Sequence, residues 1–157
     1  MNAGEMLYHG IEILGLKGHE LLYATWHLTE QVQLLGIVNI VLACIAGLQF
    51  VVRRVNRYGY RNKNAFLRAL NRPLTKMHPY VGFLLVISAG VHGYLAFETL
   101  WLVHTGTLAW GILLVMMVVA LLGKKFRIPP RWIMVHRILA LFFVAAILLH
   151  VFARNIL

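Results

Sequence analysis

Acidic residues are scarce in this chain. Its 157 residues contain no aspartate and only five glutamates, which are Glu5, Glu12, Glu20, Glu30 and Glu98. None of the five lies in the middle of a long apolar segment. A proton relay through a membrane normally pairs buried histidines with acidic side chains. The scarcity of carboxylates therefore counts against a histidine-dependent, proton-coupled transporter, although we keep that function as an alternative.

Cysteine is almost absent as well. Cys44 is the only one, and it sits in an apolar run. A single cysteine excludes a disulfide, a cysteine-based zinc site and an iron–sulfur cluster within this chain. The N-terminus lacks the basic segment of a signal peptide and carries Glu5 instead, so we expect no cleaved leader.

What the chain has in abundance is apolar sequence. Its hydrophobic fraction is 61% and its mean hydropathy is +0.75, which is too apolar for an ordinary soluble domain. We predict an all-α, integral membrane four-helix bundle over residues 34–157. The expected spans are residues 34–52, 76–101, 105–123 and 131–152. Residues 1–33 are expected to form one or two short helices at the interface or capping the bundle, unless residues 21–35 extend the first span.

The net charge of +10 is concentrated in two clusters between apolar spans. This placement is typical of the cytoplasmic side of a membrane protein, and it argues against a nucleic-acid partner. The second and fourth spans then run parallel, and both termini lie outside a bacterial or archaeal cytoplasmic membrane. The connector over residues 53–76 has amphipathic character with Phe66, Leu67 and Leu70 on one side. It predicts either a surface helix on anionic lipid or a docking site for a soluble electron donor.

One spacing occurs twice in the apolar spans. His78 and His92 are fourteen residues apart in the second span, and His136 and His150 are fourteen apart in the fourth. Fourteen residues of α-helix make about four turns, so the two histidines of each pair share a face, roughly 21 Å apart along the axis. Because the two helices are expected to be parallel, His78 should meet His136 near the cytoplasmic surface, and His92 should meet His150 further out.

Intramembrane histidines are costly unless they have partners, and neutral imidazole is a good ligand for haem iron. We therefore expect two b haems between the second and fourth helices, as cofactors often are in bundle cores. Gly82 and Ala140 each follow a histidine by four residues and would let a flat macrocycle approach the backbone. The haem propionates need positive or polar groups, for which Lys76, Arg131 and Arg137 are candidates near the inner pair and Arg154 is the candidate near the outer pair.

The paired histidine helices resemble the transmembrane core of ferric reductases and NADPH oxidases, and more broadly the di-haem membrane cytochromes b. The resemblance covers residues 34–152 and rests on the spacing and order of His78, His92, His136 and His150. It implies two stacked b haems, the inner held by His78 and His136 and the outer by His92 and His150. Such proteins usually have six spans and a soluble domain for flavin and nicotinamide, whereas this chain has four spans and no Gly-rich nucleotide loop.

These features predict transmembrane electron transfer, with a soluble redox subunit or a quinol as donor. We expect the chain to act as a subunit of a larger complex or as a homo-oligomer. A quinone pocket could be lined by His104, His19 or His27 on the outer side, or by Tyr80 and Arg137 on the inner side. His9, His19 and His27 are candidates for another metal, with simple interface residues as the alternative. A non-redox membrane anchor for a soluble partner is the other alternative function.

Overall fold

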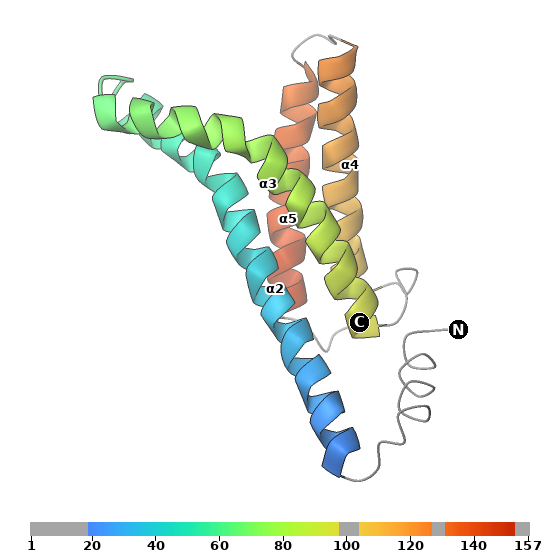
Figure 1. Ribbon diagram of the computed structural model, residues 1–157. Helices are drawn as coiled ribbons and strands as arrows, with labels where there is room; N and C mark the ends of the chain where they lie inside the picture. The colour runs from blue at the N-terminus through green and yellow to red at the C-terminus, as the bar shows by residue number, and fades with distance from the viewer. Residues whose placement is uncertain (1–18, 98–103, 127–130, 153–157) are drawn as a thin grey trace.

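The fold is entirely helical in the part of the chain that the structure describes, which is residues 19–97, 104–126 and 131–152 of a computed structural model (Figure 1). Four α-helices follow one another, and a short π-helix, η1, follows the first of them. They are α2 (His19–Arg54), η1 (Val55–Gly59), α3 (Ala65–Phe97), α4 (Thr105–Lys125) and α5 (Arg131–Phe152). The predicted all-α four-helix architecture is confirmed. All four α-helices are long and apolar enough to cross a membrane.

The helices are arranged as two antiparallel hairpins. Helix α2 packs along α3, and α4 packs along α5, whereas α3 and α4 have fewer contacts and α3 and α5 have almost none. The end of α2 and the start of α3 lie at the same end of the bundle as the end of α4 and the start of α5, at the top of Figure 1. This end carries the two basic clusters of the sequence, and we call it the basic end.

The predicted limits of the spans agree with the observed helices best in the second hairpin. Helix α5 begins and ends at the expected residues, and α4 ends two residues later than expected. Helix α2 begins at His19 rather than near residue 34, so the alternative in which residues 21–35 extend the first span is the one observed. The predicted short N-terminal helices otherwise fall on residues 1–18, which lie outside the described residues.

Helix α3 begins eleven residues before the expected start of its span, at Ala65 instead of residue 76. The side chain of Asn64 caps it, because Asn64 Oδ1 accepts a hydrogen bond of 3.0 Å from the backbone N–H of Leu67. Pro73 and Pro79 lie inside the helix, where each removes a backbone donor and favours a bend. Figure 1 shows this bend: the first turns of α3 lean away from α4 and α5, and the rest runs down beside them.

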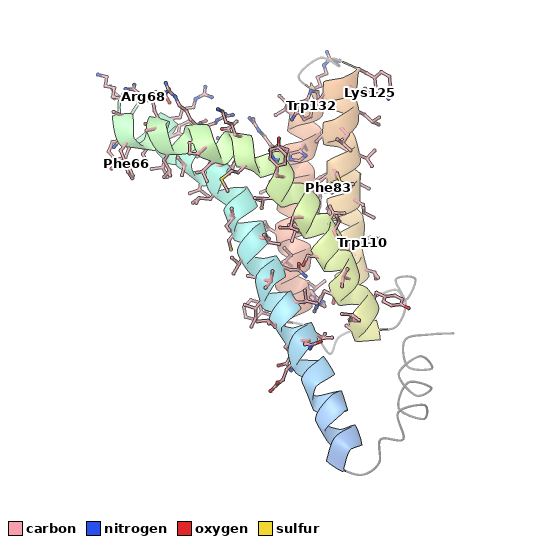
Figure 2. All side chains as sticks on the ribbon, viewed as in Figure 1. Phe66, Arg68, Phe83, Trp110, Lys125 and Trp132 are labelled. Atoms are coloured by element: carbon pink, nitrogen blue, oxygen red, sulfur yellow. The ribbon has the colours of Figure 1, made fainter. Side chains whose placement is uncertain are left out.

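A tryptophan joins the two hairpins. Trp110 of α4 (labelled in Figure 2) donates from Nε1 to the carbonyl of Val86 in α3, at 3.0 Å. The same indole lies over Gly90, where a Cβ atom would be only 3.3 Å from Nε1. Close approach of the indole to α3 therefore depends on a residue without a side chain at position 90.

The core at this junction is small and centres on Leu85, Val86 and Leu113. Leu85 has only 3% of its surface exposed. Most large apolar side chains of the described helices are exposed instead, which is the distribution expected for helices surrounded by lipid.

Candidate functional site

Both histidines of α3 are oriented by backbone carbonyls of α2. His78 Nδ1 lies 3.0 Å from the carbonyl oxygen of Ala46, and His92 Nδ1 lies 3.0 Å from that of Val32. The two carbonyls are fourteen residues apart, as the two histidines are, because the helices run antiparallel in constant register. The side chains at 78, 85 and 92 repeat every seven residues, which is the spacing that keeps one face of a helix against its partner.

The second hairpin repeats the arrangement. His136 of α5 lies with Nδ1 at 3.2 Å from the carbonyl oxygen of Met116 in α4. His150 lies with Nδ1 at 2.9 Å from the hydroxyl oxygen of Thr105, at the first residue of α4. All four histidines of the two predicted pairs therefore use Nδ1 to contact the other helix of their own hairpin.

These contacts determine which ring nitrogen carries the proton. A carbonyl oxygen can only accept, so Nδ1 of His78, His92 and His136 must donate its hydrogen. In the neutral ring Nε2 is then the nitrogen with a free lone pair, which is the form that binds metals. None of these three rings has a hydrogen bond through Nε2 within the described part of the chain.

The structure brings His78 and His136 together across the two hairpins. Their ring centroids are 6.1 Å apart and their planes are inclined by 79°. Two imidazoles bound to opposite sides of one metal ion, at about 2 Å each, have ring centres roughly 6 Å apart. The observed spacing therefore fits two axial ligands of a single iron, and both rings are only half-buried.

At the opposite end, the described contacts place His92 and His150 against different neighbours. The His92 ring lies against Gly36 of α2, where a Cβ atom would be 3.2 Å from the ring carbon Cε1. The His150 ring lies beside that of His104, with centroids 6.4 Å apart and planes inclined by 33°. The partnership of His92 with His150 stays a prediction.

His104 has a structural role as the N-cap of α4. Its Nδ1 accepts backbone hydrogen bonds from Gly106 at 3.0 Å and from Thr107 at 3.4 Å, and the Thr107 side chain completes a capping box. Burial lowers the pKa of His104, which keeps the ring neutral and able to accept. In that neutral ring the hydrogen is on Nε2, so His104 is not in the form that ligates iron. This supports His92 rather than His104 as the outer ligand.

Glycine is needed at position 106, where the rings of His104 and His150 lie side by side. A Cβ atom at this position would lie 2.8 Å from His104 Cε1 and 3.1 Å from His150 Cε1. Gly106 and Thr105 were not among the residues predicted from the sequence to form the site. The sequence did contain an indication of their role, because Thr105 and Gly106 directly follow His104 at the expected start of a helix.

The other predicted site residues fall into four groups. Gly82 borders open space, because a Cβ atom there would meet nothing within 4 Å, and Ala140 is half-buried. The candidates for the inner propionates and the inner quinone pocket are exposed, namely Lys76, Tyr80, Arg131 and Arg137. His19 and His27 lie in the first turns of α2. His9 and Arg154 lie outside the described residues.

Within the described residues no group of three or more histidine, cysteine or acidic side chains gathers as a metal site would require. Pairs of imidazoles are what the geometry offers, and haem needs no more than two protein ligands. Comparison with family models, curated proteins and solved structures gives no match. The function is therefore inferred from the geometry alone.

Thr105 provides a test of how the outer histidine is held. Replacing Thr105 by Val keeps the shape of the side chain but removes the hydroxyl bonded to His150. Because groups that orient a ligand are typically worth tenfold or more in affinity, we expect the variant to retain about tenfold more weakly the haem that His150 is predicted to hold. Haem titration of the apoprotein measures this, with Thr75→Val as the control. Equal retention in both variants would contradict an orienting role for Thr105.

Proposed function

We propose that this chain is a membrane cytochrome that holds two b haems between its hairpins and transfers electrons from one membrane face to the other. The observation that carries the proposal is the common orientation of the histidines. Each ring is fixed through Nδ1 to its own hairpin, and His78 meets His136 from the other hairpin at the spacing of two ligands on one iron.

The burial of these rings supports the same function. Four imidazoles at membrane depth are half-buried, and three of them have no partner for Nε2 in the described chain. A polar group left without a hydrogen bond in hydrocarbon costs several kcal/mol. The histidines lie on α3 and α5, and these two helices have almost no direct contact with each other. The space between them is therefore not a packed helix–helix interface. A cofactor in that space would relieve the cost.

In this proposal His78 and His136 hold the haem at the basic end, and His92 and His150 hold the other. Iron with two histidine ligands supplies a one-electron couple and has no open position for oxygen or substrate. The two histidines of each helix are separated by roughly 21 Å of helix axis, which is most of a hydrocarbon core of about 30 Å. The two sites together therefore reach across the apolar layer.

The surroundings of the inner pair suit a haem with its carboxylates toward the surface. Gly82 leaves open space one turn beyond His78, and Ala140 is small at the matching position of α5. Exposed cations at the basic end are available to the propionates, namely Lys76, Arg131 and Arg137. By the positive-inside rule this end faces the cytoplasm. The electron donor is a quinol or a soluble redox subunit.

Gly82 offers a test of this placement. Leucine at position 82 should fill the open space beside His78, and we expect it to displace most of the inner haem while leaving the helix intact. Gly47→Leu is the matched control, because position 47 of α2 also borders open space and is exposed. Haem per chain in the purified variants measures the effect. A full complement in Gly82→Leu would rule out haem at this position.

Electron transfer itself is tested in vesicles. The haem-loaded chain is reconstituted into liposomes that enclose ferricyanide, and a membrane-impermeant reductant is added outside. We expect the enclosed ferricyanide to be reduced at least tenfold faster than in protein-free vesicles, and His92→Ala to lose most of this rate. Vesicles with fully haem-loaded chain that reduce ferricyanide no faster than empty vesicles would refute the function.

A further inference from the structure

The basic end carries a feature of which the proposed haem sites use only Lys76. The end of α2, η1, the following turn and the first turns of α3 form a helical hairpin tip over residues 50–77, which we call the arm. Figure 1 shows the arm leaning sideways from the axis of α4 and α5. A hairpin tip that turns away from the bundle axis at this end would lie along the membrane surface rather than project from it.

The arm is strongly cationic and has no internal counter-charge. No acidic residue occurs between Glu30 and Glu98, so none of its cations can be neutralised within this stretch. All eight basic side chains are exposed, namely Arg53, Arg54, Arg57, Arg61, Lys63, Arg68, Arg72 and Lys76. They require anions from outside the chain.

The charges are separated from exposed apolar groups on the same helix. Arg68, Arg72 and Lys76 recur every four residues along one side of α3. Phe66 and Met77 lie on another side and are 72% and 50% exposed. Figure 2 shows Arg68 and Phe66 on opposite sides of the arm, with nitrogen-bearing side chains gathered along the edge of Arg68.

Hydrogen bonds stabilise the turn between η1 and α3, and with it the shape of the arm. Arg68 Nη1 donates to the carbonyl of Asn62 at 2.8 Å, and the backbone N–H of Asn62 donates to the carbonyl of Asn56, also at 2.8 Å. Arg54 donates to the hydroxyl of Tyr58 at 3.0 Å. Tyr58 is nevertheless 67% exposed. Tyrosines at such positions are typical of the interface between membrane and water.

We propose that the arm lies flat in the membrane surface at the basic end and binds the phosphate groups of anionic phospholipids. Arginine predominates among its cations and matches phosphate with two parallel hydrogen bonds. A lipid monolayer meets both sides of the arm, with phosphates for the cations and acyl chains for Phe66 and Met77. An acidic soluble protein would meet the cations alone and leave the apolar side in water. This proposal does not depend on haem.

The test compares two variants of equal charge in the full-length protein. Arg53→Gln/Arg57→Gln removes two of the eight cations of the arm, and Lys124→Gln/Lys125→Gln removes two cations from the end of α4. Native mass spectrometry counts the phosphatidylglycerol and phosphatidylcholine that remain bound after extraction from mixed bilayers. We expect the wild type to retain more phosphatidylglycerol than phosphatidylcholine. The arm variant should retain roughly tenfold less phosphatidylglycerol than the wild type, and the control variant should differ from the wild type by no more than about twofold. Equal retention of both lipids by the wild type would overturn the proposal.

A second measurement tests where the arm lies. In a Cys44→Ser background, Phe66→Cys and Arg72→Cys each carry a fluorophore in vesicles that contain phosphatidylglycerol. We expect a nitroxide on the lipid chain near the headgroup to quench the label at 66 more than the label at 72. A water-soluble nitroxide should show the reverse preference. Equal quenching of both labels by the aqueous probe would mean that the arm does not lie in the lipid. Loss of the bound lipid on adding inorganic phosphate would mean that the arm binds free phosphate and not the lipid surface.

Discussion

Replacing His78 by alanine should lower the haem content from about two to about one per chain, and replacing His136 should remove the same haem. The reason is that the centroids of the two rings are 6.1 Å apart and neither ring has a hydrogen-bond partner for Nε2 in the described chain. With one ligand lost, the remaining imidazole cannot hold iron from both sides.

The double variant makes this prediction specific. If His78 and His136 serve one haem, His78→Ala/His136→Ala retains as much haem as either single variant, because both changes act on the same site. His78→Ala/His92→Ala, on one helix, should retain none. Haem is quantified per chain after purification in detergent. Loss of all haem from His78→Ala/His136→Ala would show that the inner pair has been assigned wrongly.

Replacing His92 by alanine should remove the other haem and leave the spectrum of the inner one unchanged. His92 and His78 are fixed by separate carbonyls of α2, and His136 by a carbonyl of α4, so the loss of the His92 ring need not disturb the inner pair. His150→Ala should lose the same haem, since its ring is the one on α5 at that depth. Both variants should also lose electron transfer across vesicles while keeping about one haem per chain.

His104→Ala is the matched control for the outer site, because His104 lies beside His150 but accepts hydrogen bonds through Nδ1. Loss of the cap should cost about 1 kcal/mol of stability. The haem content should stay at the wild-type value. If His104→Ala loses a haem and His92→Ala does not, then His104 is the outer ligand.

The sequence predicted the helical architecture and the proximity of His78 to His136, because apolar length and a fourteen-residue spacing are properties of single helices. The pairing of His92 with His150 stays a prediction. The limits of α4 and α5 followed from the same patterns. The start of α3 did not, because Arg68 and Arg72 interrupt the apolar pattern although both residues favour helix, and Asn64 caps the helix upstream of them.

The orientation of the histidine rings could not be predicted from single segments of the sequence. Which carbonyl receives each Nδ1 depends on the register between two helices, and that register is set by packing along their whole length. The role of His104 was hidden for a similar reason. A histidine before a helix can cap it, ligate metal or face water, and only the position of its Nδ1 relative to the first N–H groups of α4 distinguishes these roles.

The most direct test of the account is the dithionite-reduced minus oxidised spectrum of the purified protein, with haem quantified per chain. The proposed pair of haem sites predicts the sharp bands of low-spin b haem with two histidine ligands, at about two haems per chain. A colourless protein, purified from cells with ample haem, would contradict it. In that case the half-buried histidines would belong to a membrane anchor or a transporter.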